Sequence, residues 1–142
     1  MDQTLDFQAL VWAAGDAIIA SGMDGAILLW NPAAERIFGF RAEEALGRSL
    51  DLIIPERLRN RHWEGYERVM RTGKTRYGAE VLRVPALHKE GRSLSIAFTV
   101  GLLCSQDGRV QAIAAIVRDE TSRWQEERAL RARLLDLEKR SS

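Results

Sequence analysis

The sequence has 142 residues, 46% of them hydrophobic, which is the size of one globular domain and leaves no room for a second. Its 21 Lys and Arg residues balance 20 Asp and Glu residues, and a net charge of +1 argues against binding to nucleic acid or an anionic membrane. A single cysteine, Cys104, excludes an internal disulfide, and no segment resembles a signal peptide or a membrane span. We therefore expect a soluble cytoplasmic protein.

The first third of the chain predicts a helix followed by a hairpin and short helices. Residues 4–14 have apolar residues near helical spacing, with Thr4 placed to cap the helix. Two β-rich runs, 17–21 and 26–31, flank an Asp-Gly pair that favours a hairpin turn. Residues 32–55 are broken by glycine and proline and predict only short helical pieces.

Residues 56–72 predict the long central helix of the fold. They contain no breaker except Gly65, and their helical spacing turns one mixed face inward. The residues of this inward face are Leu58, His62, Tyr66, Val69 and Met70.

Three consecutive strands and a charged helix follow. The strands are predicted over 77–87, 93–103 and 110–117, and Pro85 marks the first of them as an edge strand or the site of a bulge. The tail, 121–140, has three leucines at coiled-coil spacing and needs a partner helix to be stable. Strands grouped at both ends of a helical middle indicate an α+β fold, one five-stranded sheet with helices over one face.

The order of elements and several short segments resemble the PAS family from about Asp16 to Thr121. The segments that carry the resemblance are Asp24-Gly25, Asn31-Pro32-Ala33-Ala34-Glu35, Phe38-Gly39, Glu44-Ala45-Leu46-Gly47, Ile54-Pro55, Lys89-Glu90-Gly91 and Arg118-Asp119-Glu120-Thr121. The resemblance implies an antiparallel sheet of order 2-1-5-4-3 with a pocket under the central helices. It divides the chain into an N-terminal flanking helix (1–15), a PAS sensor domain (16–120) and a C-terminal signalling and dimerisation helix (121–142).

Within that family, the segment from Arg61-His62 to Thr72-Gly73 is similar to the central helix of the haem PAS domain of FixL-type oxygen sensor kinases. The resemblance places the proximal iron ligand at His62. It places propionate contacts at Arg68 and Arg76, and it places the distal lining at Glu80, Phe98 and Val100. The family's distal arginine falls on Leu82, while Arg83 should point to the opposite face of its strand. A distal side without that donor favours carbon monoxide or nitric oxide over oxygen.

Simpler interpretations of these residues stay open. His62 also suits the surface of a haem-free PAS helix, and most basic residues around it suit a solvated face. His88 is interpreted as a solvated loop residue, and Cys104 as an inert, semi-buried thiol. No cysteine stands where flavin photochemistry of the LOV type needs one, and no catalytic motif occurs. We therefore expect a flavin-free protein that is not an enzyme.

The sequence thus predicts a PAS sensory domain that binds a small ligand or cofactor, with a b-type haem gas or redox sensor as one reading. The alternatives are a haem-free module for an organic ligand and a module used only for dimerisation or protein interaction. We expect a homodimer formed through the terminal helices. We also expect the signal to leave through a downstream signalling protein or an output domain outside these residues.

Overall fold

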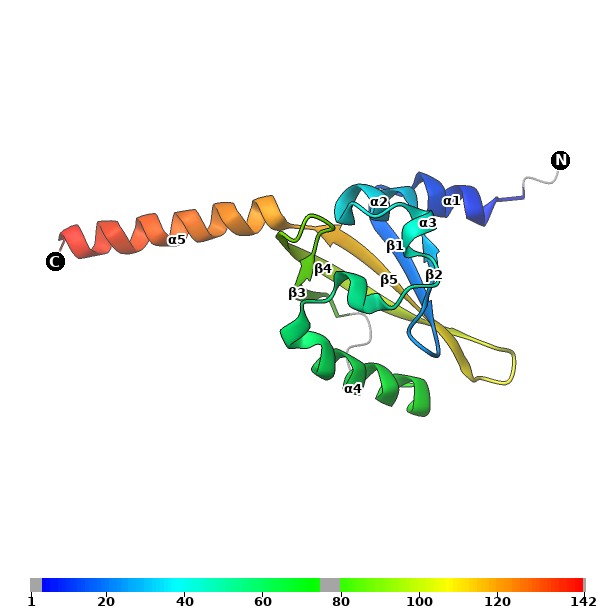
Figure 1. Ribbon diagram of the computed structural model, residues 1–142. Coiled ribbons are helices and arrows are strands. Elements are labelled where there is room, and N and C mark those ends of the chain that lie inside the picture. Colours follow the sequence, from blue (N-terminus) through cyan, green and yellow to red (C-terminus); the bar gives the residue numbers. More distant parts are fainter. Residues whose placement is uncertain (1–3, 75–79, 142) are drawn as a thin grey trace.

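The protein is built on a five-stranded antiparallel sheet with helices across one face (Figure 1). The computed structural model describes residues 4–74 and 80–141. The strands are β1 (Ala17–Gly22), β2 (Ile27–Trp30), β3 (Leu82–Leu87), β4 (Ser93–Cys104) and β5 (Val110–Asp119). They lie in the order β2-β1-β5-β4-β3, which is the order that the PAS resemblance implies.

Short helices connect the hairpin to one long helix. The helical elements are α1 (Phe7–Ala13), α2 (Pro32–Phe38), α3 (Ala42–Ala45), the 3-10 helix η1 (Leu50–Ile53), α4 (Glu56–Thr72) and α5 (Thr121–Ser141). The bounds of α4 are those that its sequence pattern predicts. None of the helices in the described part of the chain combines the length and the hydrophobicity needed to cross a bilayer.

Turn chemistry explains why the hairpins form where they do. Gly25 has a φ of +80°, which glycine adopts without strain, and the Asp24 carboxylate accepts a hydrogen bond from the Ala26 amide at 3.0 Å. Pro85 pairs with Ser95 in β3, and β3 is an edge strand, as the missing proline N–H requires.

Four sequence-based expectations differ from the structure. Strand β3 begins at Leu82 rather than at residue 77, and residues 75–79 lie outside the described part of the chain. Asp6 caps α1 in place of Thr4, because its carboxylate accepts from the Ala9 amide. His88 is not a solvated loop residue but is 7% exposed, and its ring lies against Gly39. Cys104 is exposed rather than semi-buried.

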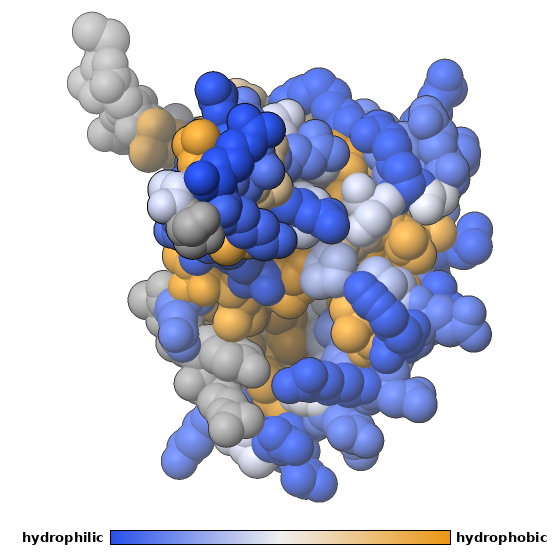
Figure 2. Space-filling model, turned by 90° about the vertical axis from the view of Figure 1, so that its left-hand side faces the viewer, coloured by the Kyte–Doolittle hydropathy of each residue, from blue (hydrophilic) through white to orange (hydrophobic). Residues whose placement is uncertain are grey.

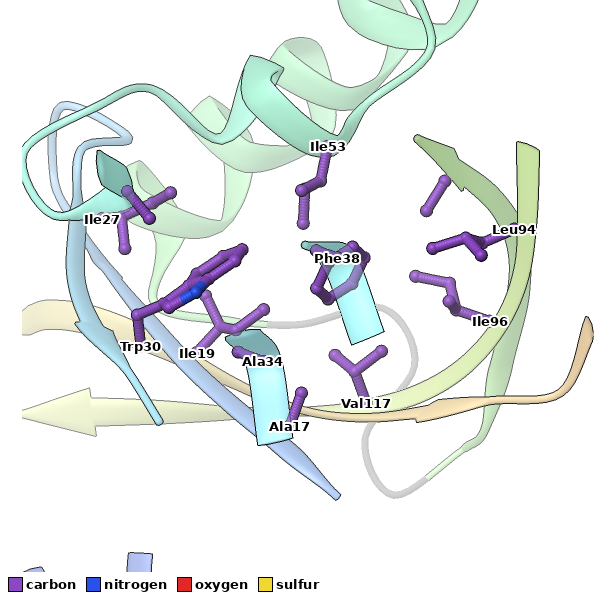
Figure 3. Close-up of a cluster of buried hydrophobic side chains, with 12 residues drawn as sticks. Ala17, Ile19, Ile27, Trp30, Ala34, Phe38, Ile53, Leu94, Ile96 and Val117 are labelled. Atoms are coloured by element: carbon purple, nitrogen blue, oxygen red, sulfur yellow. The ribbon is translucent and has the colours of Figure 1, made fainter. Parts of the chain in front are cut away.

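The main hydrophobic core lies between the sheet and the short helices (Figure 3). Trp30 and Phe38 fill its centre, with ring centroids 5.5 Å apart, and the Trp30 indole donates to the Phe40 carbonyl oxygen at 2.9 Å. In this view Ala17 of β1 and Val117 of β5 close it from below, Leu94 and Ile96 of β4 close it from the right, and Ile53 of η1 points into it from above. This core fixes α2 and η1 on the sheet and sets where α4 starts.

The two terminal helices contribute nothing to the core. No residue of α1 or α5 is buried, and α5 projects away from the sheet as a single helix (Figure 1). Asn31 holds the end of α1 against α2: its side-chain amide donates to the carbonyl oxygens of Val11 and Asp16 at 2.9 and 3.1 Å.

Candidate ligand-binding slot

Helix α4 lines the sheet without closing on it. Tyr66 is its only buried residue, although the inward face predicted from the sequence also includes Leu58, His62 and Val69, which are half-buried. The backbone of α2 approaches β1 closely, whereas the backbone of α4 stands off from the sheet. Part of this face packs on the sheet, where Tyr66, Val69 and Met70 form a hydrophobic cluster with Val100 and Ile113. The half-buried remainder of the face, around His62, is the candidate slot between α4 and the sheet.

Tyr66 connects α4 to the sheet across this slot. Its hydroxyl donates to the Gly22 carbonyl oxygen and lies 3.0 Å from the Ser21 hydroxyl oxygen, at the end of β1. Burial raises the pKa of the Tyr66 phenol, so the hydroxyl keeps its proton for this bond. Tyr66 therefore sets the spacing between α4 and β1.

His62 lies one turn before Tyr66 on the same face of α4. Its ring makes an edge contact with Trp63 at 4.6 Å between centroids and a tilted contact with Tyr66 at 5.7 Å. Its Nδ1 atom is buried and has no hydrogen-bond partner among the described residues. Burial lowers the pKa of His62, and the nearby Asp51 carboxylate opposes this only in part. The imidazole is therefore neutral at pH 7 and able to act as a ligand.

Trp63 connects α4 to η1 and to the β1–β2 turn. Its indole Nε1 donates to the Asp51 carboxylate at 2.7 Å, and its ring lies so close to Gly25 that a Cβ there would overlap it. Trp63 is therefore packed between η1 and the β1–β2 turn.

The opposite wall of the slot is apolar. On β4, Leu94 and Ile96 are 2% and 5% exposed, whereas Phe98 and Val100, further along the same inward row, are only half-buried. Leu82 pairs with Phe98 and continues this row onto β3. Figure 2, which shows the left-hand side of Figure 1, has a hydrophobic hollow near its centre with hydrophilic residues below it and to its right.

The predicted site residues lie on separate elements of the structure. His62 is half-buried on the inward face of α4, while Leu82, Phe98 and Val100 are half-buried on the inward row of β3 and β4. Glu80 is exposed just before β3, and Arg68 is exposed on α4. Arg76 lies outside the described residues.

Arg83 points away from the slot, as strand alternation predicts. Its guanidinium lies 3.4 Å from the Glu120 carboxylate, next to the start of α5. It therefore supplies no donor to the slot.

A wide hollow lies elsewhere on the described surface. It has a volume of about 1090 Å³, opens widely to solvent, and lies between the end of α4 and the β4–β5 turn, where Met70, Cys104 and Val110 help to line it. His62 does not line it. Because it is open and the slot is apolar and partly covered, we place the candidate site at the slot.

Sequence reasoning missed how His62 is surrounded. The contacts of Trp63 with Asp51 and Gly25, and the bond between Tyr66 and Gly22, join segments that are distant in the chain. The available signal was the clustering of aromatic residues beside the histidine on one helix. No three His, Cys, Asp or Glu side chains in the described residues gather to hold a metal ion.

Comparison with known proteins places this fold in a family. The family model for the PAS fold matches residues 12–125. The oxygen sensor protein DosP of Escherichia coli is 31% identical over 93 residues, which is 66% of this chain and 11% of that protein. The sensor protein FixL of Bradyrhizobium diazoefficiens is 31% identical over 124 residues, 87% of this chain and 23% of that protein.

A solved structure agrees with this assignment at the level of the fold. The PAS domain of a protein from Colwellia psychrerythraea superposes with a TM-score of 0.71 at 19% identity, over 82% of this chain and 95% of that one. The chain spans less than a quarter of the length of the curated relatives it matches. Because the family model covers most of the sequence, this chain belongs to the PAS fold family, the family of sensory domains found in signalling proteins.

Proposed function

We propose that this PAS domain is a haem-based sensor that holds a b-type haem in the slot, with His62 as the axial ligand. The observation that carries the proposal is the state of His62: a neutral, half-buried imidazole on the slot face of α4 whose Nδ1 lacks a partner. Because Nδ1 is enclosed by protein atoms, the other ring nitrogen, Nε2, is the atom that would bind the iron. Bound haem would supply an iron centre for a diatomic gas or for redox change, and neutral imidazole is its common protein ligand.

The apolar sheet wall supports a particular gas preference. The residues facing the slot from β3 and β4 are Leu82, Phe98 and Val100, and none of them donates a hydrogen bond. Bound oxygen is polar and gains most from such a donor. We therefore propose carbon monoxide or nitric oxide, rather than oxygen, as the signal.

The propionate contacts of the proposal involve two arginines. The family resemblance assigns them to Arg68 and Arg76. Arg68 is exposed on α4, where a guanidinium is available to a carboxylate at the edge of the slot. Because most of the haem contacts would be apolar, we expect Arg68→Ala to weaken haem retention without abolishing it.

The start of α5 contacts β3 and β4, the strands that face the slot. These contacts offer a route by which a change in the slot reaches α5. The Ser95 amide of β4 donates to the Thr121 hydroxyl at 3.0 Å, and the Glu120 amide donates to the Ser95 carbonyl oxygen at 2.8 Å. Arg83, the neighbour of the slot residue Leu82, is paired with Glu120. A shift of β3 or β4 on ligand binding would therefore change the direction of α5.

We propose that α5 passes the signal on to another helix, protein or domain. Because Leu130, Leu134 and Leu137 of α5 are exposed, we propose that α5 pairs with the same helix of a second copy in the cytosol. A downstream signalling protein, or an output domain of a longer chain, would follow this helix.

An absorption spectrum tests the haem proposal. Protein produced with haem available should show a Soret band, and His62→Ala should lose it. Arg61→Ala, which changes an exposed neighbour on the same helix, serves as the matched control and should keep it. A wild-type protein that stays colourless after haem addition would overturn the proposal, and a melting temperature raised by an apolar carboxylate would then favour an organic ligand.

A second variant tests the gas preference. Leu82→Arg places a donor on the slot face of β3 and should slow oxygen dissociation from the ferrous protein, with little effect on carbon monoxide. An unchanged oxygen dissociation rate would mean that Leu82 does not face the iron.

A further inference from the structure

The Trp63 side chain is fixed in place by contacts on three sides. Its indole Nε1 donates to the Asp51 carboxylate at 2.7 Å, its ring lies against Gly25, and its ring centroid is 5.1 Å from that of Tyr66 in an edge contact. These contacts come from η1, from the β1–β2 turn and from the next turn of α4. A ring that is held on three sides keeps one orientation, so it can support the side chain beside it.

His62 is the side chain that Trp63 supports. A histidine that binds a metal is usually oriented by a hydrogen bond from its second ring nitrogen. The Nδ1 atom of His62 has no such partner among the described residues. Two aromatic rings contact it instead, Trp63 at an interplanar angle of 77° and Tyr66 at 41°. The orientation of the imidazole therefore depends on where the Trp63 ring lies.

Asp51 is itself held in place on η1. Its amide donates to the Ser49 hydroxyl at 3.1 Å, and the Arg59 guanidinium donates to its carbonyl oxygen at 3.3 Å. Ile53, in the same short helix, packs in the main hydrophobic core. The Asp51 side chain is 40% exposed, but a hydrogen bond to a carboxylate at 2.7 Å is short and strong. Asp51 thus connects the position of Trp63 to the core.

Gly25 leaves the space that the Trp63 ring occupies. Its φ is +80°, and a Cβ at this position would overlap the ring. Gly47 has nearly the same φ, +82°, but a Cβ there would meet no described atom within 4 Å. Alanine brings similar backbone strain at either position, whereas only at Gly25 does it also displace the indole. Gly47 therefore provides a matched control for the contact between Gly25 and Trp63.

We propose that Asp51 and Gly25 are positioning residues that act through Trp63 and hold the His62 imidazole in the orientation in which its Nε2 atom meets a ligand. The proposal rests on the proposed function for the identity of that ligand, a haem iron. The orientation itself is a property of the haem-free protein, so it can be measured without haem. Neither Asp51 nor Gly25 is assigned a contact with haem.

Nuclear magnetic resonance of the haem-free chain tests the orientation of His62. The chain has 2 histidines, His62 and His88, and His62→Ala identifies which ring signals belong to which. Spectra are recorded at about pH 8, above the ordinary pKa of histidine. Asp51→Leu and Gly25→Ala should move the His62 ring signals toward those of an unfolded chain. Asp51→Asn, which keeps an oxygen acceptor for the indole, and Gly47→Ala should leave them in place. The His88 signals should stay constant throughout, which shows that each variant is folded.

Haem titration of the same variants measures the consequence for ligand binding. Loss of a residue that orients a metal ligand typically costs about ten- to a hundredfold in metal affinity. Asp51→Leu and Gly25→Ala should therefore raise the haem dissociation constant at least about tenfold. Asp51→Asn and Gly47→Ala should leave it unchanged. Because Asp51→Asn also removes the charge that faces Arg59, it separates the hydrogen bond to Trp63 from that ion pair.

The two measurements separate this inference from the haem proposal. His62 ring signals that stay at their wild-type positions in Asp51→Leu and Gly25→Ala would overturn the positioning role, whatever the protein binds. A haem affinity that both variants leave unchanged, although the signals move, would overturn it as well. A wild-type protein that takes up no haem would overturn the proposed function instead, and the ring signals would still decide whether Asp51 and Gly25 orient His62.

Discussion

Removing the hydroxyl of Tyr66 tests the hydrogen bond that sets the distance between α4 and the sheet. In Tyr66→Phe the ring still fills its place, but the Gly22 carbonyl oxygen loses its donor and the buried Ser21 hydroxyl loses its neighbour. Leaving such groups without a partner costs about 1–3 kcal/mol, and we take about 2 kcal/mol because water can reach part of the slot. For a domain of this size that loss lowers the melting temperature by about 6 °C.

Urea unfolding measures the loss of stability of the whole domain, and hydrogen exchange measures the loss of stability in each helix and strand. Because Tyr66 is the only buried residue of α4, exchange should accelerate more in α4 than in the core strands β1 and β5. Ser21→Ala is the control: the hydroxyl of Tyr66 keeps the Gly22 acceptor, and the loss should stay below about 1 kcal/mol. The double variant should be about as stable as Tyr66→Phe alone. A Tyr66→Phe protein within about 0.5 kcal/mol of wild type would refute the role assigned to this bond.

Three other substitutions probe the core, the turns and the slot. Asn31→Ala should cost about 2–4 kcal/mol in urea unfolding, because its fully buried amide also accepts from the Ile18 amide; a cost below about 1 kcal/mol would contradict this. Gly39→Ala should cost about 2 kcal/mol or more, since φ is +83° and the new Cβ would lie 2.6 Å from the His88 ring; unchanged stability would show that the loop relaxes. The pKa of His62 is lowered in the folded state from 6.5, so the unfolded chain binds more protons just below that pH. Stability of the haem-free protein should therefore rise with pH up to about 6.5 and fall on acidification below it. Urea midpoints between about pH 5 and 7.5 should show this fall in wild type but a smaller one in His62→Gln.

The fold and the inward face of α4 were predictable because both rest on local patterns. The bounds of α4 follow from an uninterrupted helical period that ends at Gly73, and the hairpin follows from one Asp-Gly pair. Pro85 identified an edge strand through its missing N–H. Each of these signals acts within a few residues of the chain, where backbone sterics and hydrogen bonding decide the outcome.

The start of β3 was placed too early because Val81, just before it, does not pair with another strand in the described residues. A strand is stable only through its neighbours, and a sequence pattern does not show where the partner strand ends. The burial of His88 was missed for a similar reason. The His88 ring packs against Gly39, which lies in a distant part of the sequence. The ring fits there because glycine has no side chain.

The sequence alone determined the order of helices and strands, the single imidazole on the inward face of α4, and the lack of a distal arginine at Leu82. Tertiary structure decided that the Nδ1 atom of this imidazole has no partner, that Tyr66 bonds to Gly22, and that the apolar residues of α1 stay outside the core. These features depend on how far apart two elements stand. That distance is set by all the side chains packed between them, so no single segment of the chain encodes it.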